Sequence, residues 1–143
     1  MSYRSWFQHH GEKHKKIVDR LVARGYTTAQ IIDYFDFDNV VVAEPDFCPL
    51  YAQSKQCHDI EKLNCYLCAC PLFRFNADGI SESQGVKTFS YCDVDSKFGR
   101  QGRYGDAIHQ DCTNCAVPHG KKYVSVNFDL NWFDTMKHCD IGA

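Results

Sequence analysis

The sequence NCYLCACPLF, residues 64–73, places three thiols within six residues and follows them with a proline. The two residues between Cys65 and Cys68 give the spacing at which a tight turn directs both sulfurs at one ion, as in zinc knuckles and iron–sulfur loops. Cys70 completes the same site if the backbone is extended, whereas a turn sends it to a neighbouring site. Pro71 excludes Cys70 from the helical region. A Cys-Pro that ends a close-spaced cysteine run slightly favours an iron–sulfur site.

Further cysteines lie on both sides of this stretch. Cys112-Thr113-Asn114-Cys115 repeats the two-residue spacing, and two such pairs in one chain indicate that its halves close on a shared metal. Phe47-Cys48-Pro49-Leu50 has the same Cys-Pro-Leu order as Cys70-Pro71-Leu72, which is consistent with two equivalent ligand turns. With the thiols between them, the predicted metal ligands are Cys48, Cys57, Cys65, Cys68, Cys70, Cys92, Cys112 and Cys115.

The composition is that of a folded domain in a reducing compartment. The chain has 143 residues, of which 44% are hydrophobic and 14% aromatic, so it suits one domain with a modest core and is not a disordered tail. It has nine cysteines, whereas a secreted disulfide framework favours an even number and a leader sequence. Residues 1–16 contain no apolar leader segment, and no apolar run approaches the length of a membrane span. We therefore predict a cytoplasmic protein, without a membrane partner, whose thiols bind metal.

Residues 1–46 are predicted to form a helical hairpin. Apolar side chains at helical spacing predict a first helix over residues 12–24, which Gly25 ends. Thr27 and Gln30 have the spacing of a capping box and predict the start of a second helix. Three histidines in this region are expected to be solvated: His9, His10 and His14.

The turn between these two helices resembles the opening of a helix-turn-helix motif, and the basic first helix would suit DNA. A recognition helix with Arg, Lys, Asn or Gln facing the groove should follow. The chain continues instead with residues 36–42, which are acidic and then β-branched. Because acidic side chains oppose the electrostatic attraction that dominates DNA affinity, nucleic acid is not an expected partner.

Residues 47–143 are predicted to be a cysteine-rich metal-binding domain that forms one compact unit with the hairpin. Strands are predicted over Val86–Cys92 and over Lys122–Trp132, where apolar and polar residues alternate, and a short strand over Val40–Ala43. Residues 99–105 predict an exposed, glycine-rich loop without the spacing of a phosphate loop. The expected fold class is α+β: a helical hairpin beside an irregular, metal-stapled core with a short antiparallel sheet.

The cysteine pattern of residues 47–120 resembles the cysteine-rich small domain family, a zinc-finger-like group of prokaryotic proteins. The resemblance rests on FCPLY at 47–51, on NCYLCACPLF, and on DCTNCAVPH at 111–119. It implies metal binding through these cysteines, and some family members occur beside corrinoid-related proteins. Members often carry a further cysteine shortly after Cys-x-Cys-Pro, where this chain has an arginine and a phenylalanine, and Cys92 is expected to take that place.

These patterns predict a cysteine-ligated metalloprotein and leave two metals open. Eight thiolates are enough for one or two iron–sulfur clusters of the 4Fe–4S kind, which would pass single electrons to a redox protein partner. The same spacings suit zinc in a structural module that binds a protein partner. No catalytic motif predicts an enzyme, so any catalysis would have to come from the metal.

The remaining thiol and three histidines have weaker claims to a metal. His119 is a nitrogen ligand, a redox neighbour or a surface turn histidine. His58 and His109 have less support than His119 from their positions, and Cys139 is expected to be free.

Overall fold

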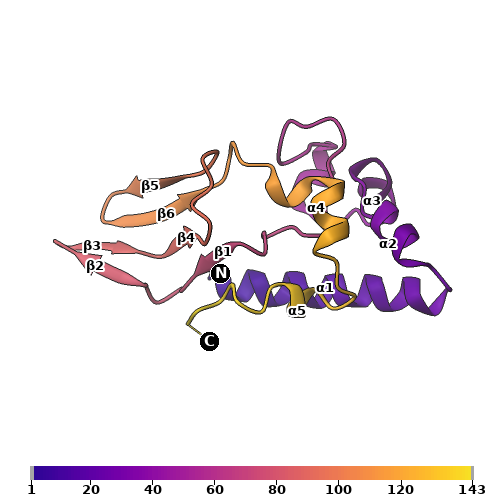
Figure 1. The fold of residues 1–143 in the computed structure, drawn as a ribbon, viewed down its shortest axis with the longest axis horizontal. Helices are drawn as coiled ribbons and strands as arrows, with labels where there is room; N and C mark the ends of the chain where they lie inside the picture. The colour runs from indigo at the N-terminus through magenta and orange to yellow at the C-terminus, as the bar shows by residue number, and fades with distance from the viewer. Residues whose placement is uncertain (1, 143) are drawn as a thin grey trace.

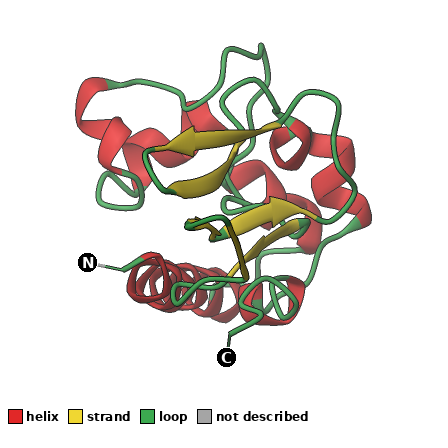
Figure 2. Cartoon of the chain, turned by 90° about the vertical axis from the view of Figure 1, so that its left-hand side faces the viewer, coloured by secondary structure: helices red, strands yellow, loops and turns green. Residues whose placement is uncertain are grey.

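The computed structural model describes residues 2–142 and confirms the α+β fold class. The strands gather at the end of the molecule where the long helix α1 begins, and the short helices lie along the rest of α1 (Figure 1). Seen from the strand end, α1 lies beneath the strands (Figure 2). The helices are α1 (Tyr3–Ala23), α2 (Thr28–Tyr34), α3 (Phe37–Ala43), α4 (Lys121–Val126) and α5 (Trp132–Thr135), with 3-10 turns η1 (Pro49–Gln53) and η2 (Val117–His119). The strands are β1 (Phe73–Phe75), β2 (Ser81–Ser83), β3 (Val86–Thr88), β4 (Ser90–Cys92), β5 (Arg100–Tyr104) and β6 (Ala107–Asp111).

Helix α1 begins earlier than the sequence predicts. Ser2 caps it by accepting a hydrogen bond from the Ser5 N–H at 3.2 Å, and Gly25, with a φ of +83°, ends the last turn. His10 and His14 lie on the buried face of α1 and are 3% and 0% exposed. The prediction that they are solvated is wrong, because their rings complete the stripe of α1 that packs on aromatic side chains; only the first of the three histidines is exposed.

The second helix starts as predicted, but the segment that follows it has a different secondary structure from the one predicted. Thr27 and Gln30 form the capping box at the start of α2, with hydrogen bonds of 2.8 and 3.2 Å. The strand predicted over Val40–Ala43 is wrong, since these residues end α3. Val40 is completely buried whereas Val42 is 79% exposed. A helix buries Val40 while leaving the other β-branched residues near the surface, so tertiary packing overrides their strand propensity.

The strands form two small sheets. β1 and β4 pair antiparallel, and the second sheet has the order β2-β3-β6-β5, in which only β3 and β6 run parallel. The strand predicted over Val86–Cys92 is divided at Phe89, so that β3 and β4 belong to different sheets. The loop predicted over residues 99–105 is also wrong in part: it contains β5, although most of that strand is exposed.

The strand predicted over Lys122–Trp132 is wrong. This segment forms α4, a turn and α5. Its apolar residues do not share one face, because Val126 is 76% exposed while Trp132 is completely buried. The intervening polar residues shape the turn: Asp129 accepts from the Asn131 N–H at 2.8 Å, and the Asn131 side chain caps α5. The alternation of apolar and polar residues therefore arises from turn and capping residues between two helices.

One apolar core joins the helices to the cysteine-rich region. Leu21 of α1, Phe35 after α2, Tyr66 of the cysteine stretch and Trp132 of α5 are all completely buried within it. His14 links the same parts, since its Nε2 lies 3.0 Å from the carbonyl oxygen of Tyr66. Among the described residues, none of the helices is both long and apolar enough to cross a membrane.

Candidate metal centre

A buried asparagine fixes the cysteine stretch to the helical part of the molecule. The side-chain amide of Asn64 donates to the carbonyl of Ile32 at 2.8 Å and to the carboxylate of Asp36 at 2.9 Å. Its side-chain oxygen accepts from the Tyr66 N–H at 2.9 Å, and its own N–H donates to the His119 carbonyl at 2.9 Å. Because Asn64 is completely buried, these bonds set the position at which Cys65 enters the site.

A tight turn separates the thiols on either side of Ala69. The φ angles of Ala69 and Cys70 are +89° and +63°, in the left-handed region that favours glycine. The sequence left open whether Cys70 joins the site of Cys68 or a neighbouring one. The turn lies between them, and each thiol interacts most strongly with a different group of cysteines.

The first group, thiol set 1, consists of Cys48, Cys57, Cys65 and Cys68. Burial and the charges of Cys57 and Cys48 raise the pKa of Cys65 to about 12. Burial raises the pKa of Cys68 as well, and the charges of the other three thiols raise it further. Burial and the charge of Cys48 raise the pKa of Cys57. Each pair in the set therefore interacts electrostatically, which places the four sulfurs in one neighbourhood.

The second group, thiol set 2, consists of Cys70, Cys92, Cys112 and Cys115. Burial, followed by the charges of Cys70, Cys115 and Cys92, raises the pKa of Cys112 to about 11. Burial also raises the pKa of Cys70 to about 11, with contributions from Cys92, Cys139 and Cys115. The two Cys-x2-Cys pairs, which the sequence suggested would share a metal, thus lie in different sets.

The two sheets bring the members of set 2 together. Cys92 ends β4, which pairs with β1 so that Cys92 faces Phe73, directly after the Cys70-Pro71 turn. Ser90 of β4 accepts from the N–H of Gln110 on β6 at 2.7 Å, and the chain then leaves β6 toward Cys112. Strand pairing therefore collects thiols that are far apart in the sequence.

A cavity of about 490 Å³ lies against both thiol sets. All four thiols of set 2 line it, together with Cys57 and Cys68 of set 1. Most of the remaining wall is apolar and comes from α1, the segment around β1, and η2, including Trp6, Phe73 and Pro118. Burial and the neighbouring thiols favour the protonated form of these cysteines, and a metal cation would displace those protons and neutralise the thiolates, so the donor set fits a bound metal group.

The sulfurs of each set are spaced more widely than the ligands of a single tetrahedral zinc ion. Among the described residues, the one group of three or more Cys, His or carboxylate ligand atoms that lie within 4.8 Å of one another is Cys57, His58 and His119. No three sulfurs of either set are therefore that close. Tetrahedral zinc with Zn–S bonds of about 2.3 Å holds its sulfurs about 3.8 Å apart. A four-iron cluster spreads its cysteines more widely, since each binds a different iron.

Two histidines stand beside Cys57. His119 is 4% exposed, which excludes the surface role that its position in a turn allowed. His58, which had the weaker claim from the sequence, directs its Nδ1 at the Cys57 sulfur at 3.0 Å. Its place next to Cys57 in the chain was the available sign. His109 lies on β6, exposed and stacked on Phe89.

Cys139 is completely buried beside set 2 and adds to the raised pKa of Cys70, but it does not line the cavity. Its thiol donates to the Cys70 carbonyl at 3.5 Å, and burial raises its pKa to about 11. All nine cysteines are free of disulfides.

Comparison of the chain with protein-family models, with curated proteins and with solved structures found no match, so the centre is interpreted from its own geometry.

Proposed function

We propose that this chain is an iron–sulfur protein that passes single electrons, with a cluster bound by Cys70, Cys92, Cys112 and Cys115. The observation that supports this most strongly is the cavity, which all four thiols of set 2 line and which is much larger than a single closed metal site needs. The cluster, when bound, accepts one electron and releases it to a partner, and no covalent bond of the protein changes.

The residues around set 2 suit this role. Ser96 donates its backbone N–H to the Cys92 sulfur at 3.5 Å, and its hydroxyl lies 3.4 Å from the Cys115 sulfur. Hydrogen bonds to ligand sulfurs and exclusion of water both adjust the reduction potential of a cluster. The apolar wall at Trp6 and Phe73 excludes water from one side.

The loop after β4 supplies a surface for a redox partner. Val94 and Phe98 are each 57% exposed on this loop, a few residues from Cys92. Small exposed apolar areas of this kind suit brief contacts between proteins, such as those that carry electrons. The partner we propose is therefore a redox protein that docks beside Cys92.

A structural zinc module is the second candidate, and one observation favours it. Cys57, His58 and His119 are ligand types that zinc accepts, and their three ligand atoms lie within 4.8 Å of one another. Structural zinc sites have four protein ligands, however, and this group has three.

The test is anaerobic purification of the whole chain, followed by a visible spectrum and by iron, sulfide and zinc analysis of the same sample. We expect a brown protein with roughly four irons and four acid-labile sulfides per chain, whose colour dithionite bleaches. Cys115→Ser should remove most of the iron, whereas Cys139→Ser, which changes a buried thiol that does not line the cavity, should retain it. A colourless protein that binds zinc and no iron would refute the proposal.

A further inference from the structure

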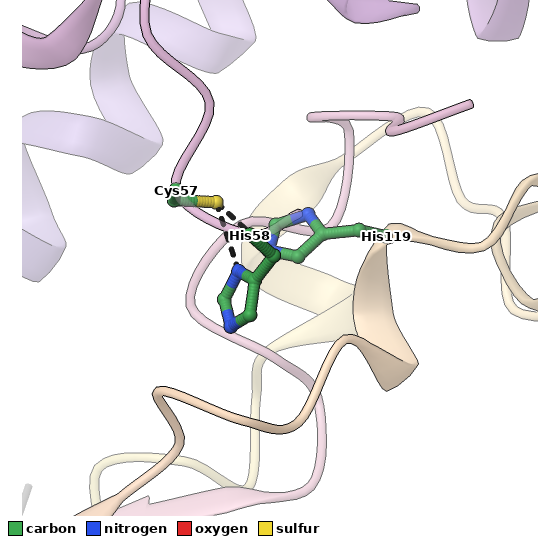
Figure 3. Close-up of side chains that lie close together, drawn as sticks. All are labelled: Cys57, His58 and His119. Carbon is green, nitrogen blue, oxygen red and sulfur yellow. Dashed lines mark hydrogen bonds between the residues drawn. The ribbon is translucent and has the colours of Figure 1, made fainter. Parts of the chain in front are cut away.

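Three ligand atoms, two from neighbouring residues and one from a distant part of the chain, converge at one edge of the cavity. The sulfur of Cys57 lies 3.0 Å from Nδ1 of His58 and 3.4 Å from Nε2 of His119. All three atoms lie within 4.8 Å of one another, and all three residues line the cavity. Figure 3 shows the two rings on the same side of the sulfur.

The far nitrogen of each ring determines which tautomer is present. Nε2 of His58 lies 2.9 Å from the Cys112 carbonyl oxygen, and Nδ1 of His119 lies 2.9 Å from the Asn64 carbonyl oxygen. A carbonyl oxygen only accepts, so these nitrogens carry the protons. In a neutral ring the other nitrogen then has a lone pair, and both lone pairs are directed at the Cys57 sulfur.

With both rings neutral, hydrogen bonds do not satisfy this arrangement. The single proton of a thiol can be donated to one of the two nitrogens, which leaves the other lone pair facing a sulfur. A second proton on one ring would resolve this, but it would place a positive charge in a group whose other ring contacts are carbonyls, with no carboxylate bonded to either ring among the described residues. A cation placed among the three atoms satisfies all of them.

The carbonyl contacts are those expected of metal-binding histidines. Such a histidine almost always donates its other ring N–H to a carbonyl or carboxylate, which fixes the ring and selects the tautomer. Both histidines do this here, with two different carbonyls. The His58 contact also ties this group to Cys112, a member of thiol set 2.

We infer that Cys57, His58 and His119 bind a single zinc ion whose fourth coordination position faces the cavity. One thiolate and two imidazoles match the preference of zinc for sulfur and nitrogen, and three protein ligands with one open position are typical of zinc sites that bind water or a small ligand. This zinc site is separate from the cluster proposed on set 2. It does not depend on that cluster, because it shares no ligand with it.

The first test measures zinc and iron in the same preparations of the full chain. We expect one zinc per wild-type chain, and His58→Ala and Cys57→Ser should lower zinc affinity by at least about 100-fold while the iron content stays unchanged. His109→Ala removes an exposed histidine on β6 and should have no effect. His58 is half-buried, so the result does not depend on whether changes at buried His119 fold.

The second test examines the open position with cobalt in place of zinc. Four-coordinate Co²⁺ bound by one thiolate absorbs in the visible and near-ultraviolet, and azide added to wild-type protein should shift the visible bands as it enters the fourth position. Absence of any azide-dependent change would overturn the open position. His58→Ala should lose the cobalt spectrum.

The outcomes separate this inference from the proposed function. Zinc that is retained in both His58→Ala and Cys57→Ser refutes the site, as does wild-type protein that binds neither zinc nor cobalt. If the histidine variants lose iron and sulfide instead of zinc, the histidines belong to the cluster site, and this result also refutes the zinc site. Protein without iron, but with one zinc that depends on His58, would refute the cluster alone. Loss of iron with retention of zinc in Cys92→Ser would support both.

Discussion

At the scale of single residues, Ala69 decides how the thiols are divided. With φ angles of +89° at Ala69 and +63° at Cys70, the backbone turns between Cys68 and Cys70 and directs the two sulfurs into different sets. A non-glycine residue in this region costs about 1–2 kcal/mol, and such conformations are concentrated at functional sites. Because Ala69 also lines the cavity, we place the strained turn in the candidate metal centre.

Substitutions at Ala69 should reveal this strain through metal content. Ala69→Gly should retain full iron and zinc content, because glycine adopts a positive φ freely. Ala69→Val should lower both the metal content and the unfolding temperature, since a β-branched residue is a severe outlier at this φ. Ala52→Val, at an exposed position in η1, provides the control for the added methyl groups. Equal metal content in the valine and glycine variants would contradict the strain.

Sequence spacing suggested the eight thiols but not their division, and the reason lies in these residues. The spacing of cysteines in the sequence limits how far apart their sulfurs can lie. It does not predict the left-handed turn at Ala69, because that turn depends on packing against distant parts of the chain. His58 was given less weight for a similar reason: His119, which contacts the same Cys57 sulfur, lies 61 residues further along the chain. The two rings meet because Asn64 is hydrogen-bonded to the backbone and the ring of His119 and holds that segment beside the cysteine stretch.

Asn64 should be the most sensitive polar position of the core. Asn64→Ala leaves the Tyr66 N–H without its partner in a buried site and removes the bonds to the Ile32 carbonyl and the Asp36 carboxylate, so we expect a loss of about 2–4 kcal/mol in the free energy of unfolding. Asn39→Ala also removes a bond to a backbone carbonyl but at an exposed position, and should lose less than about 1 kcal/mol. Urea denaturation of the metal-loaded proteins measures both. Similar losses in the two variants would show that burial does not determine the effect.

At the scale of elements, the sequence predicted those features that depend only on neighbouring residues. The capping box of Thr27 and Gln30 depends on neighbouring backbone groups, so the start of α2 was predicted correctly. The alternation over Lys122–Trp132 failed because its polar residues cap and turn the chain, and because Tyr66 and Trp132 fix this segment to other parts of the core. Their side chains bond the backbone carbonyls of Asp129 and Cys68.

The contact between α1 and α5 depends on a glycine. A Cβ atom at Gly11 would lie 2.3 Å from the Phe133 ring and 2.8 Å from that of Trp132, which is completely buried. Gly11→Ala would gain up to about 1 kcal/mol from helix propensity, but overpacking of this contact should cost about 1–3 kcal/mol. We therefore expect a lower unfolding temperature in Gly11→Ala than in Gln8→Ala, a control at an exposed position of the same helix. A higher temperature would show that α5 moves aside freely.

At the scale of the whole molecule, the helical part supports the metal centre through buried polar groups as well as apolar contacts. His14 lies between Phe35 and Tyr66, stacked on one ring at 4.9 Å and edge-on to the other at 4.4 Å. His10 stacks on Trp6 at 4.9 Å and contacts the ring of Phe47. The folded protein thus holds two imidazole rings in surroundings that favour their neutral form.

These buried histidines should make stability depend on pH. Burial lowers the pKa of both His10 and His14 to about 3, from an ordinary value of 6.5, with the charge of His14 adding to the effect at His10. Between these values the unfolded chain binds more protons than the folded one. The stabilising contribution is therefore complete above pH 6.5 and decreases as the pH falls toward 3, by about 1.4 kcal/mol per pH unit for each histidine.

His10→Phe isolates this effect from acid release of metal, which both proteins share. The variant keeps an aromatic ring in the stack and removes one of the two groups that take up protons on unfolding. Its free energy of unfolding should increase relative to wild type as the pH is lowered from 7 to 5, by about 1–2 kcal/mol, as measured by urea denaturation at each pH. A difference that stays constant over this range would mean that His10 is protonated in the folded core. The neutral aromatic packing between α1 and the cysteine-rich region would then have to be revised.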